Sequence, residues 1–209
     1  TLTVTVTATA PGFNSTTATI DVLDHEIIPP LLHSLPGAPA TLYLDFDGHF
    51  EAQWETYNNA LTPVFDADGV SNLFSQGELT SITEIWQRVA EDYAPFNIDV
   101  TTVLPPSFDD GVAVRVAIGG SSLTWFGESA GGVAYVNSFT NSFSNVVYVF
   151  PQQLANNARS IAEATSHEAG HAFAVKFRHL ERGVAAHAEA DDDRLPDSEL
   201  VEKCCYVVR

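Results

Sequence analysis

The chain has 209 residues, of which 45% are hydrophobic and 17% are charged, a composition typical of a globular domain with its own core. The formal net charge of −18 at pH 7 would repel a phosphate backbone or an anionic membrane surface. It therefore argues against nucleic-acid and lipid binding and favours a cation as ligand. No run of residues reaches the roughly 18 apolar positions of a membrane span. Because the sequence begins at Thr1 and contains no methionine, we expect a mature or excised segment.

Cysteine is confined to the end of the chain, at Cys204 and Cys205. The main body is therefore expected to have neither a disulfide framework nor a cysteine zinc cluster. The adjacent pair is predicted to be two free thiols, because neighbouring cysteines bridge only with strain. Few cysteines and lysines, together with many threonines, asparagines and aspartates, favour a bacterial protein that is secreted to the extracellular space.

The N-terminal segment, residues 1–24, has the pattern of a β-hairpin. Residues 1–10 alternate between threonine and apolar side chains, and a Pro-Gly turn leads to a second β-rich run over 16–23. Because an isolated hairpin is marginal in water, we expect it to close a β-sandwich, and residues 3–24 resemble the last strands of immunoglobulin-like repeats in bacterial surface proteins. Residues 25–40 contain four prolines and predict a linker, so a larger multidomain surface protein is expected.

The main domain is predicted over residues 41–177 as an α/β (α+β) sandwich with a mixed, twisted sheet. A capping box of Ser75 and Glu78 begins a helix whose apolar residues keep to one face. A second capping box, Ser160 and Glu163, is predicted to begin a helix near the C-terminal end. Strands are predicted over residues 41–46, 97–103, 112–118, 132–136 and 146–150.

The second predicted helix carries the sequence His-Glu-Ala-Gly-His at residues 167–171. Because positions i and i+4 lie on the same face of a helix, His167 and His171 are placed to hold one metal ion. Glu168 neighbours that face and can act as general base on a water that a zinc ion activates. A solvated pair of helical histidines is the alternative interpretation.

Four segments together, residues 43–48, 85–102, 131–135 and 167–171, resemble secreted bacterial metzincin-type zinc metallopeptidases, including those of planctomycete-like surface proteins. The resemblance covers about residues 38–175. It implies a metzincin-like sandwich fold, a bound Zn²⁺, a third histidine ligand, a methionine turn beneath the metal, and hydrolysis of protein or peptide substrates.

The resemblance also implies an edge strand that pairs with an extended substrate. Such a strand offers free amides and carbonyls to a peptide. A plain sheet strand after a flexible glycine turn is the alternative interpretation. The residues that match the substrate-binding strand are Gly132, Val133, Ala134 and Tyr135.

The sequence departs from the metzincin signature directly after the second histidine. Ala174 occupies the position of a glycine, Phe177 occupies that of the third histidine, and the chain has no methionine for the turn. Alanine resists the left-handed conformation that glycine allows there. His179, His187 and the aspartates at 191–193 are candidates for a third ligand, and spacing favours none of them.

The composition changes at the same place in the chain. Residues 1–175 contain three basic residues, whereas residues 176–209 contain the other six and both cysteines. An atypical polar tail is therefore predicted over residues 178–209. Two hypotheses fit this change: an out-of-frame or degenerate replacement of the C-terminal subdomain, and a genuine polar tail.

Two other acidic groups carry weaker signals. Asp66 and Asp68 are spaced like the start of a calcium loop, but later positions lack the required oxygen donors, so an ordinary acidic turn is expected and Ca²⁺ is the alternative. Asp45, Asp47 and His49 follow the first strand of the main domain and are predicted to form a solvated loop.

These observations together predict a secreted zinc-dependent endopeptidase domain. In this interpretation His167 and His171 bind the metal, and Glu168 is the general base. An inactive extracellular binding or adhesion module that keeps the peptidase fold is the alternative, and a calcium-stabilised structural domain is a third possibility.

Overall fold

The computed structural model describes residues 2–22, 28–70, 73–173 and 205–208. Its centre is a six-stranded mixed sheet with the strand order β10-β8-β9-β7-β3-β6. Strands β6, β3, β7 and β9 are parallel, β8 is antiparallel to β9, and β10 pairs in parallel with β8. The strands are β3 (Ala40–Asp45), β6 (Ile98–Thr101), β7 (Ala113–Ile118), β8 (Gly132–Tyr135), β9 (Val146–Val149) and β10 (Cys205–Val208). The prediction of a mixed sheet with helices is confirmed.

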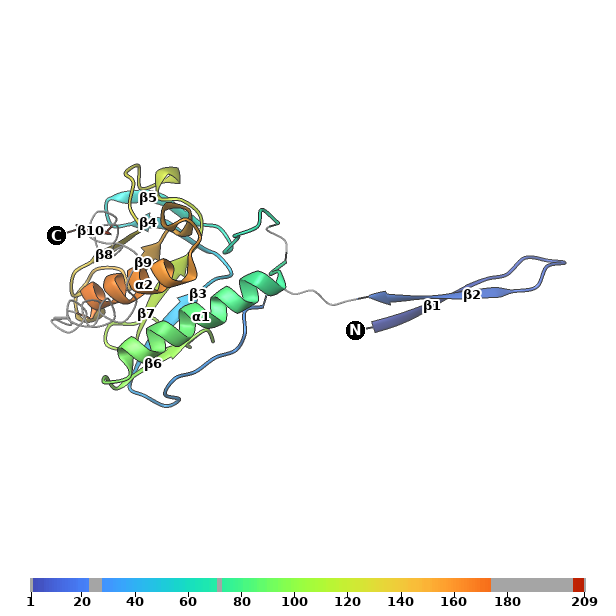
Figure 1. The fold of residues 1–209 in the computed structure, drawn as a ribbon, viewed down its shortest axis with the longest axis horizontal. Helices are drawn as coiled ribbons and strands as arrows, with labels where there is room; N and C mark the ends of the chain where they lie inside the picture. Colours follow the sequence, from blue (N-terminus) through green and yellow to red (C-terminus); the bar gives the residue numbers. More distant parts are fainter. Residues whose placement is uncertain (1, 23–27, 71–72, 174–204, 209) are drawn as a thin grey trace, which may run out of the picture.

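Two helices, α1 (Gln76–Tyr93) and α2 (Ala158–Ala172), lie side by side on one face of this sheet (Figure 1). The predicted capping box of α1 is confirmed, because the Ser75 side chain accepts the Glu78 amide and the Glu78 carboxylate accepts the Ser75 amide. The apolar stripe of α1 is fully buried at Ile82, Ile85 and Val89. Local sequence signals thus place this helix and its buried face.

The core between the sheet and the helices consists of the alternate residues of the strands that point to the helix side. Leu42 and Leu44 of β3 are completely buried there, with Val116 of β7 beside them. From the helices, Ile85 and Ile161 belong to the same apolar cluster. Burial of such aliphatic side chains stabilises the domain by roughly 1.5–3 kcal/mol each.

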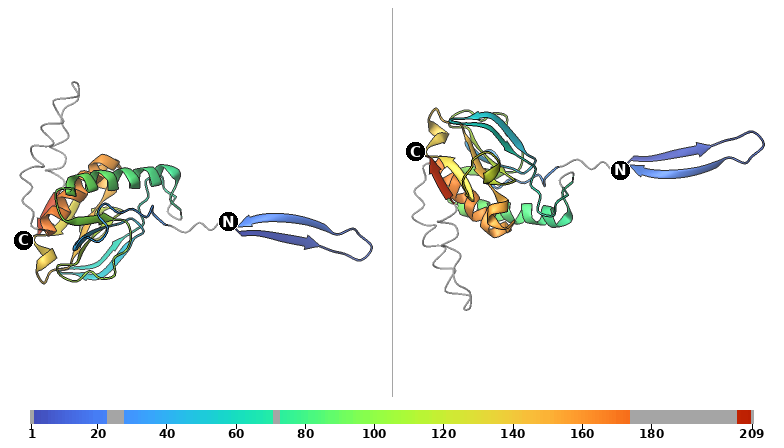
Figure 2. Two further views of the ribbon diagram at one scale, coloured as in Figure 1. Left: turned by 90° about the horizontal axis from the view of Figure 1, so that it is seen from below. Right: turned by 90° about the horizontal axis from the view of Figure 1, so that it is seen from above.

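The opposite face of the sheet is covered by a β-hairpin that the sequence analysis did not predict. Strands β4 (His49–Trp54) and β5 (Tyr57–Thr62) pair in antiparallel register and lie on the other side of the sheet from α1 and α2 (Figure 2). The domain therefore has three layers. The middle layer is buried on both faces, which fits the near-continuous apolar sequence of β7 and β9.

The N-terminal strands, β1 (Leu2–Ala8) and β2 (Thr16–Val22), form an antiparallel hairpin that lies apart from the three-layered domain (Figure 1). Val4 pairs with Ile20 and Val6 with Ala18, so one face of the hairpin is apolar and the other carries threonines. The apolar face is open, since Val6 is 50% and Ile20 57% exposed. That this hairpin closes a β-sandwich stays a prediction.

The connections between strands include short 3-10 helices at Ser122–Thr124, Ser138–Thr140 and Pro151–Leu154.

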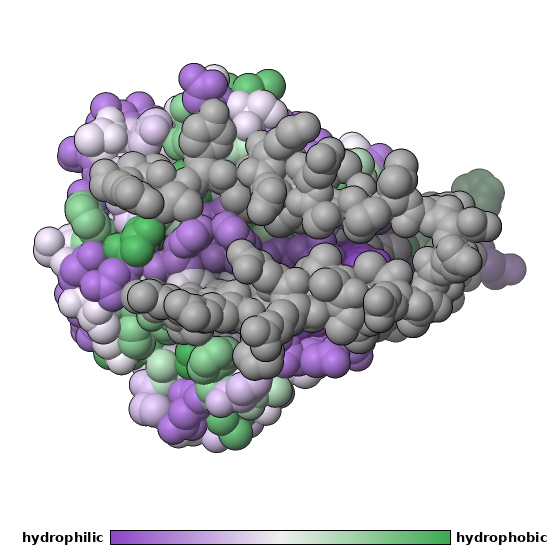
Figure 3. All heavy atoms as spheres, turned by 60° about the vertical axis from the view of Figure 1, so that its left-hand side comes forward, coloured by the Kyte–Doolittle hydropathy of each residue, from purple (hydrophilic) through white to green (hydrophobic). Residues whose placement is uncertain are grey.

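On the face of the molecule shown in Figure 3, hydrophilic and hydrophobic residues are intermixed wherever the described surface is visible. None of the helices in the described ranges has the length and hydrophobicity that a bilayer crossing requires.

Candidate functional site

The candidate metal ligands lie on the last turns of α2. This helix begins at Ala158, and its N-cap is Asn157, whose side chain accepts a hydrogen bond from the Ser160 amide at 3.1 Å. The predicted capping box of Ser160 and Glu163 is therefore wrong. Glu163 instead forms an ion pair with Arg159 across one turn. The asparagine cap satisfies an amide that the first helical turn leaves free, and this local sequence signal was missed.

His167 and His171 bring their imidazole nitrogens together. The two Nε2 atoms are 2.9 Å apart, and the rings meet nearly at right angles with centroids 4.5 Å apart. Both side chains are half-buried, so they are reachable from solvent while packing restrains them. The convergence expected from the i, i+4 spacing is present in the structure.

Both histidines are held in the neutral form at pH 7. Burial lowers the pKa of His167. Burial and, to a smaller extent, the neighbouring His167 lower the pKa of His171 to about 4. A neutral imidazole is the form that binds a metal, because its unprotonated nitrogen provides the lone pair.

Glu168 follows His167 in the helix and is buried in the interface with the sheet, where it is 0% exposed. It packs against Gly132 of β8, since a Cβ atom at position 132 would lie 2.5 Å from Glu168 Cγ and 3.0 Å from Glu168 Oε1. Only glycine leaves the space that this carboxylate occupies. The connection between β8 and the helix was not apparent from the sequence.

Several hydrogen bonds hold the helix in place around these residues. The Tyr93 hydroxyl donates to the carbonyl of Ser166 at 3.2 Å, and the Ser166 hydroxyl donates to Asp92 at 2.6 Å. At the end of the helix, the Asn137 amide donates to the carbonyl of His171 at 2.8 Å. The histidines are therefore presented by a helix that is fixed to α1 on one side and to the segment after β8 on the other.

The two histidines fit a zinc ion in chemistry and spacing. A tetrahedral ion with bonds of about 2.0–2.1 Å holds two ligand nitrogens roughly 3.3 Å apart. The observed separation of 2.9 Å between the Nε2 atoms is within a few tenths of an ångström of that value. Small rotations of the two rings would adapt the pair to the metal.

A third protein ligand is not present beside this pair among the residues that the structure describes. The positions at which the metzincin signature breaks, Ala174 and Phe177, lie outside the described residues. So do the candidate ligands His179, His187 and the aspartates at 191–193, as well as most of the predicted tail. Their contribution stays a prediction.

Strand β8 does not have the free edge that the sequence analysis expected. It pairs with β9 on one side and with β10 on the other, where Val133 is opposite Tyr206 and Ala134 is opposite Val207. The prediction that Gly132, Val133, Ala134 and Tyr135 offer an open edge to a substrate is therefore wrong for this arrangement. The pairing strand, β10, lies about 70 residues after β8 in the sequence, and local residue patterns do not predict such a pairing.

Asp45 and His49 belong to a buried polar network and not to a solvated loop as predicted. Asp45 is 1% exposed, and Arg115 Nη1 donates to Asp45 Oδ2 at 2.6 Å and lies 2.6 Å from His49 Nδ1. Burial and the nearby Asp47 raise the pKa of Asp45 to about 8, although Arg115 acts in the opposite direction. Burial, followed by Arg115, lowers the pKa of His49. Arg115 was missed because it is distant in sequence.

The acidic loop at Asp66 and Asp68 includes a third carboxylate, that of Glu78, and one ligand oxygen from each lies within 4.8 Å of the others. Glu78 already accepts hydrogen bonds from the amides of Ala67 and Ser75, at 2.7 and 2.8 Å. Glu78 is therefore buried because it caps the start of α1. The expected acidic turn is present in the structure, and a bound Ca²⁺ stays a prediction.

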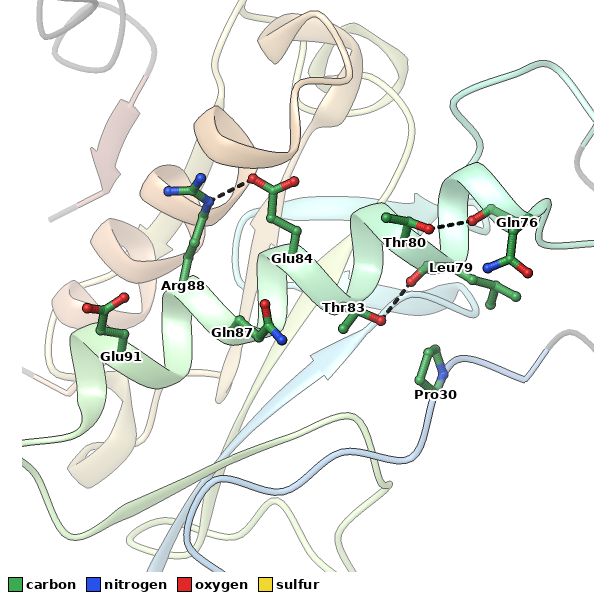
Figure 4. Close-up of a pocket in the computed structure, with 9 residues that line it drawn as sticks. All are labelled: Pro30, Gln76, Leu79, Thr80, Thr83, Glu84, Gln87, Arg88 and Glu91. Atoms are coloured by element: carbon green, nitrogen blue, oxygen red, sulfur yellow. Dashed lines mark hydrogen bonds and ion pairs between the residues drawn. The ribbon is translucent and has the colours of Figure 1, made fainter. Parts of the chain in front are cut away.

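An open groove of about 820 Å³ runs along the outer side of α1 beside Pro30 (Figure 4). Within it, the Thr80 and Thr83 hydroxyls donate to carbonyls of the same helix, and Glu84 forms a 2.9 Å ion pair with Arg88. Neither His167 nor His171 lines this groove, so it does not extend the candidate metal site.

Comparison with protein-family models, with curated proteins and with solved structures finds no match to this chain.

Proposed function

We propose that this domain is a secreted bacterial zinc-dependent endopeptidase of metzincin type. The single observation that supports this proposal most strongly is the approach of His167 Nε2 and His171 Nε2 to 2.9 Å on a helix that also carries Glu168. The helices packed on one face of a mixed sheet are compatible with such a fold. The composition supports an exported setting, and the open apolar face of the N-terminal hairpin supports an attached β-sandwich module.

When bound between the two imidazoles, zinc would supply Lewis-acid activation of a water molecule. Glu168 would take a proton from that water as the oxygen attacks the carbonyl carbon of a peptide bond, and would return the proton to the amine that leaves. Because Glu168 is buried against Gly132, its carboxylate is held in one place rather than free to rotate in solvent. The substrate would be a polypeptide in an extended conformation.

The first test is the zinc content of the purified chain, measured by elemental analysis next to a His171→Ala variant. One zinc per chain that is lost in the variant would support the ligand assignment. Substantially less than one zinc in the unaltered chain would contradict it, since a helical histidine pair alone holds the metal weakly.

The second test is hydrolysis of casein with and without a chelator. Glu168→Gln should lower the rate by roughly 10²–10⁴-fold while leaving zinc binding intact, because it removes a general base and keeps the side-chain volume. Glu163→Gln is the matched control on the same helix, since Glu163 only pairs with Arg159. Equal activity of both variants would contradict the role of Glu168.

An inactive extracellular binding module that keeps the peptidase fold is the second candidate. It is favoured by the lack of a third ligand within the described ranges. Under this alternative the chain would neither hydrolyse casein nor retain stoichiometric zinc. The two assays together therefore separate the candidates.

A further inference from the structure

The outer edge of β8 is occupied by a strand from a distant part of the chain. β10 pairs with β8 in parallel register, from Cys205 opposite Gly132 to Val208 opposite Tyr135. It stands last in the strand order of the sheet, so within the described ranges β8 is the one strand to which it is paired. The place of β10 in the sheet therefore depends on a single ladder of 4 residues.

The pairing of two strands is made by main-chain groups, because the N–H and C=O groups of one strand bond to those of the next. A strand edge therefore accepts segments of many sequences, and an extended polypeptide can add to it. Because β10 and β8 belong to one chain, their pairing is intramolecular, and a separate polypeptide competes for the same edge at a disadvantage.

The ladder lies beside the candidate metal site. Gly132, opposite Cys205 of β10, is the residue against which the Glu168 side chain packs. After the end of β8, the Asn137 amide donates to the His171 carbonyl at 2.8 Å. The last turns of α2 are thus fixed to β8 and to the segment that follows it, and β10 lies at the sheet edge near this part of α2 (Figure 2).

In this arrangement β8 is closed to a further strand. All 4 of its residues are buried, and β9 and β10 pair with its two sides. An extended polypeptide that replaced β10 would pair with β8 in the same place and pass alongside the helix that carries the two histidines. The same edge cannot hold β10 and a second segment at once.

We propose that β10 is an autoinhibitory strand, which occupies the edge of β8 at which an extended polypeptide pairs and which leaves before that polypeptide binds. The effect on hydrolysis rests on the proposed peptidase function. The exchange of β10 for another strand requires neither zinc nor hydrolysis, so it is tested by binding alone.

The first experiment replaces Tyr206 and Val207 together by proline in the full chain. Successive residues of a strand face opposite ways, so one of the two prolines removes an amide that faces β8. The probe is a fluorescein-labelled peptide, Ser-Ser-Tyr-Val-Val-Arg, which copies residues 204–209 with serine in place of cysteine. In fluorescence anisotropy it should bind the proline variant at least about tenfold more tightly than the unaltered chain.

The matched control carries Tyr206→Phe and Val207→Ile, which keep both amides and the preference for a strand. It should bind the peptide as weakly as the unaltered chain does. Circular dichroism shows whether each variant is folded. Equal binding to the unaltered chain and the proline variant, or no binding by a folded proline variant, would overturn the proposal.

Hydrogen exchange of the unaltered chain tests the same proposal without any substitution. The amides of residues 205–208 should exchange at least about tenfold faster than those of residues 113–118 in β7, because β10 leaves while the rest of the sheet stays intact. Equal protection of the two segments would mean that β10 is a permanent strand of the sheet, and the proposal would fail.

Casein hydrolysis separates this proposal from the peptidase function. The proline variant should cleave casein at least about threefold faster than the unaltered chain, and the unlabelled peptide should reverse the gain. Equal cleavage by both chains would overturn the inhibitory role of β10. If neither chain cleaves casein but the peptide binds the proline variant alone, the peptidase function fails and the exchange of strands at β8 is supported.

Discussion

The two faces of the central sheet are built from different materials. The face under α1 and α2 is packed mainly with aliphatic side chains, such as the completely buried Leu44, Val116 and Ile85, together with a few rings such as Phe46. The face under the β4–β5 hairpin is packed with aromatic rings around Trp54, whose Nε1 donates to the Val146 carbonyl at 2.9 Å. It also buries the hydrogen bond that Arg115 donates to Asp45.

This difference separates two ways of covering a sheet. On the helix face, apolar residues repeat at helical spacing, and the contacts need only shape and volume. On the hairpin face, rings and charged groups must meet specific partners from distant parts of the chain. The candidate metal ligands lie on α2, over the first face, so substitutions on the hairpin face can be made at a distance from them.

Among the substitutions compared at a single pH, the largest effect is expected from Trp54→Ala on the hairpin face. The indole is 0% exposed, contacts Tyr57, Trp125, Tyr135 and Tyr148, and makes one buried hydrogen bond. Its loss should lower the free energy of unfolding by roughly 3–5 kcal/mol in urea denaturation. A loss below 1 kcal/mol would show that the hairpin is not an integral layer.

A smaller but more local effect is expected from Gly132→Ala on the helix face. The new Cβ would lie 2.5 Å from Glu168 Cγ and 3.0 Å from the Tyr148 carbonyl oxygen, so the carboxylate must move. Overpacking of this kind costs roughly 1–3 kcal/mol.

The control for this substitution is Gly77→Ala at the start of α1, where a Cβ meets nothing closer than 3.8 Å. That change should be neutral or stabilising, because alanine is the better helix former. Thermal unfolding of both variants, with and without Glu168→Ala, measures the coupling between positions 132 and 168. Additive effects would contradict the contact.

Asp45, on the hairpin face, should make the free energy of unfolding of the domain depend on pH. Its pKa is raised to about 8 in the folded state, so between pH 4 and 8 the folded protein retains a proton that the unfolded chain has released. Stability then falls as pH rises through this window, by at most ~1.4 kcal/mol per pH unit from this group.

Urea denaturation of the chain and of Asp45→Asn at several pH values measures this contribution. The stability of the unaltered chain relative to the variant should decrease from pH 4 to pH 8 and change little above that. A relative stability that increases with pH would show that Arg115 holds the carboxylate ionised.

The smallest effect concerns the cap of α2. Asn157→Ala should cost about 1 kcal/mol, because its side chain accepts the Ser160 amide. Ser160→Ala should change the free energy of unfolding by less than about 0.5 kcal/mol, since Ser160 lies in the first turn rather than at the cap. A larger loss of thermal stability in Ser160→Ala than in Asn157→Ala would instead support the capping box predicted from the sequence.

The β4–β5 hairpin, which covers one face of the sheet, was not predicted because its local sequence signals are weak. Its turn contains no Asn-Gly or Asp-Gly pair; instead Glu55 takes a positive φ of 54° between Trp54 and Tyr57, which are paired. The ladder is also interrupted near Asn59, at φ 56°, so apolar and polar residues do not alternate regularly. Turn and strand signals were therefore weak even though the hairpin is packed on the sheet.

The pairing of β8 with β10 at the edge of the sheet is also a contact that local sequence patterns do not predict. Residues 132–136 were recognised as a strand, yet their neighbour β10 is more than 60 residues further along the chain. Residue types indicate that a segment is extended, but they do not say which segment pairs with it. The predicted open edge of β8 is absent because β10 pairs with it in the folded chain.

Residue patterns within about one helical turn predict the start and buried stripe of α1, the convergence of His167 and His171, and the extended state of most strands. They do not predict that Gly132 makes room for Glu168 or that Arg115 meets Asp45, which are contacts between separate layers. Helix geometry fixes the relation between residues i and i+4, whereas contacts across layers depend on how all elements pack together.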